Sequence, residues 1–179
     1  MTDQLVLRRF VEADLDLLLS LDRDPDVMRY VNGAQPISEE TARAQLLPTF
    51  INERSLGFWV ICKDGRDLGW VSLREYAPGS AELGYRLLPS AWGRGVARTA
   101  AREAIRRGAE AGFQRVTATA YEENLASFRV MQHCGMAYSH RFSVRRGESG
   151  AADHLPATCV PDEDAWPLDD LVYALELPH

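Results

Sequence analysis

Residues 81–101, AELGYRLLPSAWGRGVARTAA, decide the fold that this sequence predicts. The apolar segment 82–88 predicts a strand, which Pro89 and Ser90 end. A glycine-containing turn, residues 92–97, then leads directly into an alanine- and arginine-rich segment that predicts a helix. The first N–H groups of a helix have no helical partner, and the positive end of the helix dipole adds to their attraction for anions. The sequence therefore predicts an anion site here, which we interpret as the cradle of a cofactor.

The composition is that of an ordinary globular protein, and it excludes some classes of function. The chain has 179 residues, of which 46% are hydrophobic and 26% charged, and a chain of this size can bury about 70% of its unfolded surface. The net charge of −6 argues against a general nucleic-acid binder. No apolar run approaches the ~18 residues of a membrane span, and no secretion signal opens the chain. We expect one domain, residues 1–179, that is soluble and cytoplasmic and binds neither nucleic acid nor membrane.

The cysteines show no pattern of pairing. Cys62, Cys134 and Cys159 are odd in number and far apart in the chain. Such spacing is not typical of a metal site or of a disulfide framework. We expect free thiols and no metal.

Hydrophobic periodicity predicts an α+β fold with a mixed sheet. Three consecutive strands, joined by turn signals at Asp64-Gly65 and at residues 77–80, indicate an antiparallel first half, and helices and strands alternate after residue 95. The segment 27–31 is ambiguous. The seven expected strands are residues 5–7, 57–62, 68–73, 82–88, 115–120, 136–143 and 171–177. The four expected helices are residues 13–21, 38–51, 95–111 and 124–134.

The turn WGRGVA, residues 92–97, fits the pattern Gln/Arg-x-x-Gly-x-Gly/Ala, with Trp92 in the first place, Gly95 in the second and Ala97 in the third. Four further phrases, LVLRRFVEADLDLLLSL, DPDVMRYV, AELGYRLL and ENLASFRVMQHCGM, match in the same order over residues 5–142. On these residues the chain resembles the GNAT family of N-acetyltransferases, in which the pattern is the acyl-CoA pyrophosphate loop. A tryptophan in the first place is typical of one branch of this family, which includes ribosomal-protein N-acetyltransferases of the RimJ/RimL type. The chain resembles that branch in this residue.

The resemblance implies acetyl-CoA as co-substrate and an amine as acceptor, either a small-molecule amine or a peptide or protein N-terminus. In the family the strands 82–88 and 115–120 splay apart, and the pantetheine arm pairs with exposed backbone, here near Leu87 and Leu88. The glycines of the loop, which have no Cβ, let the backbone approach the phosphate oxygens. The residues expected to contact the cofactor are Leu87, Leu88, Trp92, Gly93, Arg94, Gly95, Val96, Ala97, Arg98, Asn124 and Ser127.

Four arginines recur at every fourth residue of the predicted helix. Arg94 and Arg98, in its first turn, either meet phosphates of CoA or remain solvated. For Arg102 and Arg106 we favour a solvated face with ion pairs to glutamates one turn away.

Two residues are candidates for the chemistry. Asn124 and Ser127 match the Asn-x-x-Ser of related transferases, in which the serine is proposed to protonate the departing thiolate; Asn124 is also expected to cap a helix. A thiol with a pKa near ~8.5 leaves readily, so we interpret Ser127 as a hydrogen-bond donor to developing charge. Glu82 stands where histone-acetylating members carry a general-base glutamate, and the alternative is a strand carboxylate paired with an arginine. Tyr121 and Glu122 are second choices.

The stretch 145–169 predicts a long acidic loop or lid with several glycines and prolines. We hypothesise that it shapes the acceptor site or a homodimer contact and favours a cationic acceptor. An acyl-CoA-binding sensor without turnover remains the alternative function. A nucleotide-phosphate binder ranks last, because no Lys-Ser/Thr follows Gly95.

Overall fold

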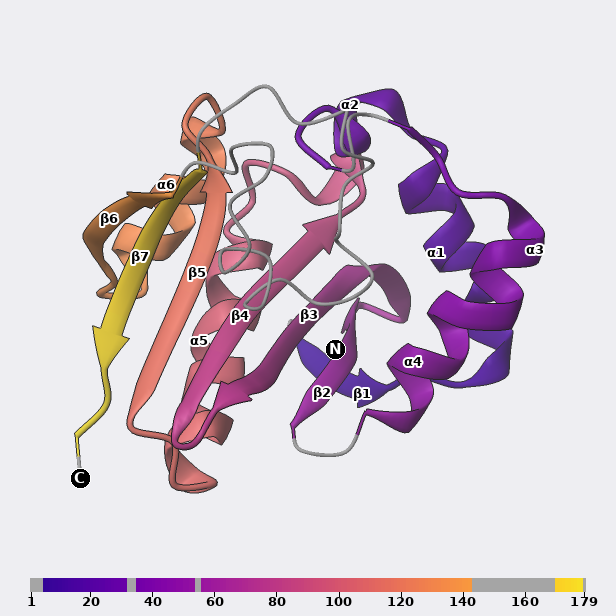
Figure 1. Cartoon of the computed structure of the whole chain (residues 1–179). Helices are drawn as coiled ribbons and strands as arrows, with labels where there is room; N and C mark the ends of the chain where they lie inside the picture. The colour runs from indigo at the N-terminus through magenta and orange to yellow at the C-terminus, as the bar shows by residue number, and fades with distance from the viewer. Residues whose placement is uncertain (1–4, 32–34, 54–55, 143–169, 179) are drawn as a thin grey trace, which may run out of the picture.

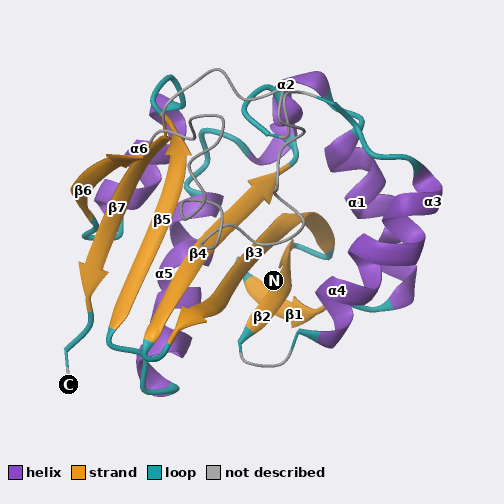
Figure 2. Ribbon diagram, in the orientation of Figure 1, coloured by secondary structure: helices purple, strands orange, loops and turns teal. Residues whose placement is uncertain are grey.

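The structure, a computed structural model, describes residues 5–31, 35–53, 56–142 and 170–178. Over these residues the chain forms a seven-stranded sheet with helices on both faces (Figures 1 and 2). The strand order is β1-β2-β3-β4-β5-β7-β6, and every neighbouring pair is antiparallel except β4 with β5. The α+β class and the mixed, mostly antiparallel sheet predicted from the sequence are confirmed.

The strands and helices begin and end near the predicted residues. The strands are β1 Val6–Arg9, β2 Gly57–Lys63, β3 Arg66–Ala77, β4 Ser80–Leu87, β5 Arg115–Tyr121, β6 Ala137–Phe142 and β7 Asp170–Glu176. The α-helices are α1 Leu15–Asp22, α2 Pro25–Met28, α3 Glu39–Thr41, α4 Leu47–Asn52, α5 Val96–Glu110 and α6 Leu125–His133.

Local sequence explains the two helical features that the prediction lacked. The ambiguous segment 27–31 overlaps α2, which Asp24 starts by accepting hydrogen bonds from the N–H groups of the second and third residues after it. Helices α3 and α4 are joined by a π-helical turn, Ala42–Leu46. We attribute this turn to Pro48, which has no N–H for the regular helical hydrogen bond.

Two hydrophobic clusters lie on opposite faces of the sheet. The cluster between the sheet and helices α5 and α6 contains fully buried small residues of α5, which let that helix lie close to β3 and β4. Its members include Leu73, Leu83, Ala100, Ala101, Ala104 and Met131. The cluster on the other face joins α1 and α4 to β2, and its members include Phe10, Leu18, Leu47, Phe50, Phe58 and Val60. Every helix of eight or more residues in the described ranges therefore buries a face against the sheet.

The neighbouring strands β4 and β5 pair over one end only. Their parallel register runs from the Ser80–Arg115 pair to the Glu82–Thr117 pair. Beyond it β4 continues alongside β3, β5 continues alongside β7, and the two strands diverge (Figure 1). This splay, which the family resemblance implied, opens a gap in the middle of the sheet.

A charged network fixes β1 to the start of the helical layer. The guanidinium of Arg8 donates to both carboxylate oxygens of Asp14, at 2.8 and 2.7 Å, and to Asp67 on β3 at 2.6 Å. Asp14 also accepts the Val11 N–H at 2.8 Å. Burial tends to raise the pKa of Asp14, but the hydrogen bonds from Arg8 and Val11 outweigh it and hold this pKa below its usual range.

We predict that Asp14→Asn lowers the free energy of unfolding at pH 7 by about 2 kcal/mol, because it removes a charge-assisted pair whose carboxylate is buried while its guanidinium is 34% exposed. The folded-state pKa of Asp14 is depressed, so its stabilisation is present above the unfolded pKa of ~3.9 and is lost as the pH falls through the folded value. The difference between wild type and variant in urea unfolding is therefore expected to shrink below about pH 4.

The matched control is Asp16→Asn, at an exposed position of α1. It is expected to change stability by less than about 0.5 kcal/mol. Equal effects of the two substitutions, or a constant Asp14 effect between pH 7 and pH 3, would contradict the prediction.

Candidate active site

The predicted anion cradle at the junction of β4 and α5 has the backbone that an anion site needs. Gly93 and Gly95 have φ angles of 69° and 73°, in the left-handed region that favours glycine. Gly95 is the N-cap of α5, and the first helical hydrogen bond runs from the Thr99 N–H to its carbonyl at 3.0 Å. The N–H groups of residues 96–98 precede that bond and carry the positive end of the α5 dipole.

A cavity of about 830 Å³ adjoins the cradle, between the end of β4, α5 and α6. Every residue that the sequence predicted to contact the cofactor lines it, except Leu88. Its other lining residues include Arg129 and His133 of α6 and Arg29 and Tyr30 beyond α2. The structure thus brings three segments that are distant in the sequence to one side of the splay.

The four arginines of the predicted helix separate into two groups, and Arg106 has the ion pairs expected for the second group, whereas Arg102 contacts a backbone carbonyl instead. Arg94 and Arg98 line the cavity. Arg102 donates to the carbonyl of His133 at 2.6 Å, so it is occupied between α5 and α6. Arg106 forms ion pairs with Glu103 and Glu110, and Arg106 with its neighbour Arg107 lowers the pKa of Glu103 to about 2.

The backbone at the end of β4 differs from the prediction for one of two leucines. The N–H of Leu88 donates to the carbonyl of Leu68 at 2.9 Å, so β3 already uses it. Alternate residues of an antiparallel strand face the same neighbour, so the backbone groups of Tyr85 and Leu87 face the splay. The Leu87 carbonyl accepts the indole N–H of Trp92 at 2.9 Å. The edge of β4 that faces the splay therefore consists of residues 83, 85 and 87 and does not include Leu88.

A second cavity, of about 280 Å³, lies on the other face of β4. Its lining includes α1 and the aromatic side chains of α4, β2 and β3. The two cavities share residues around the splay, namely Tyr30, Val31, Tyr85, Arg86, Asn124 and Ser127. A molecule in one cavity can therefore meet a molecule in the other at this opening.

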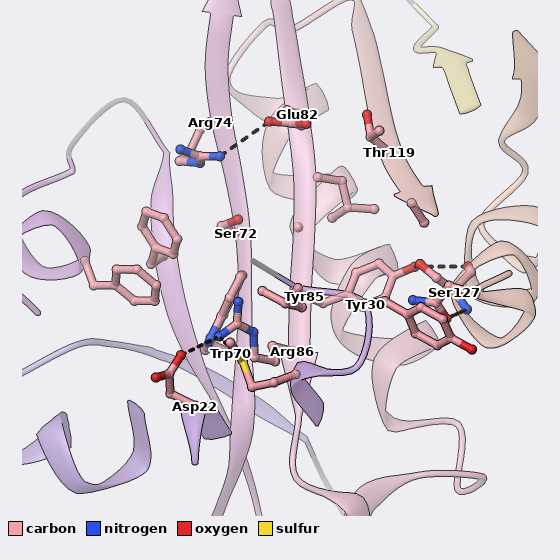
Figure 3. A pocket seen from close by; sticks show the side chains of 18 of the residues that line it. Asp22, Tyr30, Trp70, Ser72, Arg74, Glu82, Tyr85, Arg86, Thr119 and Ser127 are labelled. Carbon is pink, nitrogen blue, oxygen red and sulfur yellow. Dashed lines mark hydrogen bonds and ion pairs between the residues drawn. The ribbon is translucent and has the colours of Figure 1, made fainter. Parts of the chain in front are cut away.

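Tyr85, for which the sequence carried no signal, lines both cavities, and Figure 3 shows it beside Ser127. Its hydroxyl donates to the carbonyl of Ser127 at 3.0 Å and lies 2.7 Å from the Ser127 Oγ. Burial raises the pKa of the Tyr85 phenol, which the Ser127 hydrogen bond only partly offsets, so the phenol stays protonated at neutral pH. Asn124 caps α6 as predicted, with its side-chain oxygen accepting the Ser127 N–H at 3.2 Å.

Glu82 lies on the other side of β4 and lines the second cavity. Its carboxylate is 3.4 Å from Nη2 of Arg74, so the pairing that the sequence analysis kept as an alternative exists. Glu82 precedes Tyr85 by three residues, or about 10 Å along a strand. Figure 3 shows the Arg74–Glu82 pair well separated from the Tyr85–Ser127 pair.

The two second-choice residues are neighbours in the chain with different surroundings. Tyr121 lines the second cavity. Glu122 forms an ion pair with Arg141 at 2.7 Å.

The described residues contain two of the three cysteines. Cys62 and Cys134 are free thiols whose pKa burial raises. Within the described ranges there is no cluster of three or more His, Cys, Asp or Glu that could hold a metal ion, and no helix there is long and apolar enough to cross a membrane. The predicted loop 145–169 lies outside the described residues.

Comparisons with known proteins identify a family and a shared fold. Residues 4–137 match the family model described as acetyltransferase (GNAT) domain. The Aspergillus fumigatus protein named FsC-acetyl coenzyme A-N(2)-transacetylase is 29% identical over 140 residues, which cover 71% of this chain and 60% of that protein. This chain therefore spans less than two thirds of that relative.

Two further proteins match almost the whole chain. The Bacillus subtilis protein named uncharacterized N-acetyltransferase YnaD is 27% identical over 181 residues, covering 97% of this chain and 94% of that protein. The crystal structure of spermidine N-acetyltransferase from Vibrio cholerae, in complex with CoA and spermine, superposes with a TM-score of 0.76. It is 18% identical and covers 98% of this chain and 96% of that one, so it shows a shared fold.

We predict that Tyr85 and Ser127 stabilise the fold as a pair. Tyr85→Phe and Ser127→Ala should each lower the free energy of unfolding by about 1 kcal/mol, because each removes a part-buried hydrogen bond. The double variant should cost less than the sum by 0.5 kcal/mol or more, the coupling expected of residues in contact.

Urea unfolding of the four proteins in this cycle measures the coupling. Tyr138→Phe, at a tyrosine that is 55% exposed, combined with Ser127→Ala is the matched control and should be additive. Additive effects in the Tyr85 cycle as well would show that the contact contributes no coupling energy.

Proposed function

Because this chain belongs to the GNAT family of acetyltransferases, we propose that it transfers the acetyl group of acetyl-CoA to a primary amine. The proposed acceptor is a small-molecule amine or a peptide N-terminus. We also propose that the chain belongs to the RimJ/RimL-like branch of the family. One observation carries it: a cavity beside a phosphate-type cradle meets a second cavity at an opening through the sheet. Two substrates that enter from opposite faces can react at such an opening.

The cradle suits the pyrophosphate of CoA. The N–H groups of residues 96–98 supply donors, and the left-handed Gly93 and Gly95 shape the turn without side chains. Arg94 and Arg98 place positive charge at the positive end of the α5 dipole, an arrangement that is unfavourable without an anion. A pyrophosphate between them would remove this conflict.

The pantetheine arm would follow the edge of β4 that faces the splay. Its amides would pair with backbone groups of Tyr85 and Leu87, in the manner of an added strand. The indole of Trp92 already holds the Leu87 carbonyl, which leaves the N–H groups as the donors that we assign to the arm. This course would bring the thioester to the opening beside Ser127.

The reaction needs a neutral amine. The amine nitrogen attacks the thioester carbon, a C–N bond forms, the C–S bond breaks, and CoA leaves as a thiolate. The nitrogen gives up one proton, which we assign to Glu82 through a chain of waters, because Glu82 lies about 10 Å along β4 from Tyr85, too far for direct transfer or for a single bridging water. An α-amine, with a pKa of ~7.7–8.0, costs about 3.5 kcal/mol less to deprotonate at neutral pH than a lysine with a pKa of ~10.4.

The departing thiolate needs little help from an acid, because a thiol pKa near ~8.5 makes it a good leaving group. Ser127 and the protonated phenol of Tyr85 form one hydrogen-bonded unit at the opening. We assign to Ser127 a hydrogen bond to the developing charge, and to Tyr85 the positioning of Ser127.

The proposed activity predicts release of free thiol from acetyl-CoA when a suitable amine is added. The test is a thiol-reactive dye assay over a panel of amino acids, peptides with free N-termini, polyamines and alkyl amines, with mass spectrometry of the products. We expect an acetylated amine and free CoA in equal amounts for at least one class. Tight binding of acetyl-CoA with no release at high enzyme concentration for any amine would contradict the proposal and indicate a sensor.

The cradle predicts a second, independent result. Gly95→Ala should weaken CoA binding about tenfold or more in calorimetry, because a left-handed alanine costs about 1–2 kcal/mol and moves the loop amides. The matched control is Gly112→Ala, which has a φ of 86° at the opposite end of α5 and open space around it. It should lower stability similarly without changing CoA affinity, so equal loss of affinity in both variants would refute the cradle.

A further inference from the structure

The second cavity contains an arginine with an unused hydrogen-bond donor. Arg74 on β3 lines this cavity, and its buried Nε–H has no hydrogen-bond partner. Its Nη2 lies 3.4 Å from Glu82, a long contact, and the guanidinium lies over the ring of Phe58 at 5.3 Å. The Nε itself has almost no exposed surface, but 21% of the Arg74 side chain is exposed, so a ligand in the cavity can reach the rest of the guanidinium.

The other arginine of the cavity, Arg86, is held more completely. It lies 3.7 Å from the buried carboxylate of Asp22 and over the ring of Trp70 at 5.5 Å, and its Nη1 contacts the sulfur of Met28. Asp22 also accepts the Ile37 N–H at 2.5 Å. Arg86 therefore fixes α1 and α2 to β4, whereas Arg74 has one long ion pair and an Nε–H without a partner.

The charges that line the cavity favour an anionic group over a second cation. Among the described lining residues, two carboxylates, Asp22 and Glu82, face two guanidiniums, Arg74 and Arg86. Each carboxylate lies beside one arginine, so no described carboxylate is left over to bind a second ammonium group, as a polyamine would require. A carboxylate, in contrast, can bind the partly exposed guanidinium of Arg74, whose contact with Glu82 is long at 3.4 Å.

An apolar wall stands next to Arg74. The rings of Phe50, Phe58 and Trp70 pack together with centroids 3.8 to 5.7 Å apart, and all three line the cavity. Ser72, on the strand position between Trp70 and Arg74, adds a hydroxyl on the same face. A cavity of about 280 Å³ with this wall suits a small molecule with an apolar side chain.

We propose that the acceptor is a small amino-acid-like amine, whose carboxylate binds Arg74 and whose apolar side chain packs on Phe58 and Trp70. This inference rests on the proposed acetyl transfer and names its substrate class. Arg74 is paired across the strands with Glu82, and the splay begins directly after Glu82 (Figure 3). A carboxylate anchored at Arg74 therefore places the amine of the same molecule beside Glu82, the proposed base, at the point where the opening between β4 and β5 begins.

The test compares amines that differ only in the carboxylate. The pairs are L-phenylalanine with 2-phenylethylamine and L-leucine with 3-methylbutylamine, and kcat/KM is measured for each by thiol release. We expect the carboxylate-bearing member to be preferred at least tenfold, mostly through KM. Arg74→Met, which keeps the length and apolar contact of the side chain, should reduce this preference at least tenfold.

The wild-type preference for the carboxylate-bearing amine, divided by the preference of Arg74→Met, separates the role of Arg74 from other causes. The intrinsic basicity of each amine is the same for wild type and variant, so it cancels, and a purely structural loss would lower both members of a pair equally. Arg23→Met, at an exposed arginine, is the control variant and should leave the preference unchanged. An unchanged preference in Arg74→Met, or a wild-type preference for the carboxylate-free amines or for spermidine, would overturn the inference.

A binding measurement distinguishes this inference from the proposed function itself. Calorimetric binding of L-phenylalanine and L-leucine to the CoA-saturated protein needs no turnover. Thiol release from amines without carboxylate dependence would leave the acetyl transfer intact and refute the role of Arg74. Binding of either amino acid that depends on Arg74, with no thiol release for any amine, would support the anchor and refute the transfer.

Discussion

The divergence of β4 from β5 after the Glu82–Thr117 pair is the constraint on which the rest of the structure depends. A strand inside a sheet normally satisfies its backbone on both sides, and an unpaired buried backbone group costs as much as a lost hydrogen bond. Here β4 keeps β3 on one side while its other side faces an opening. One carbonyl of that edge, that of Leu87, is satisfied by a side chain, the indole of Trp92. A ligand with its own amides is the natural partner for the remaining groups of the edge.

In the proposed reaction, the alternation of side chains along β4 places the two substrates on opposite faces of the sheet. Glu82 and Arg86 point to the cavity that we assign to the acceptor, whereas Leu83 and Leu87 belong to the core under α5. Tyr85 lies on the α5 side and reaches Ser127 of α6 across the splay. A register shift of one residue would exchange these faces, so the pairing of β4 with β3 also fixes the chemistry.

The sequence predicted those parts of the site that depend on local backbone. Gly93 and Gly95 were identifiable because a left-handed turn before a helix requires glycine, and Asn124 because its position before an apolar segment is that of a cap. The contacts that depend on register could not be predicted. Leu87 and Leu88 are equivalent in a one-dimensional pattern, and only the hydrogen bond from Leu88 to Leu68 distinguishes them.

The same limit applies to the polar side chains. Tyr85 and Ser127 are 42 residues apart and meet only because β4 and α6 border the same opening, so no spacing in the sequence indicates the pair. For Glu82 the sequence left a base and an ion-paired carboxylate as alternatives, and the structure shows that the ion pair exists without excluding the base. Its partner Arg74 gave no signal, because an arginine in a strand is ordinarily a solvated residue.

Two electrostatic conflicts lie on opposite sides of the sheet, and each defines the ligand that would relieve it. Arg94 and Arg98 add cations to the positive end of the α5 dipole, which an anion stabilises. Arg74, beside an aromatic wall, has an Nε–H without an acceptor and a long ion pair to Glu82, so a carboxylate on an apolar molecule would stabilise its guanidinium. The two conflicts share no residue, so each ligand can bind on its own, and the reaction needs only the shared opening at Tyr85 and Ser127. An arrangement of this kind favours a direct transfer between two bound substrates, because neither has to leave before the other arrives.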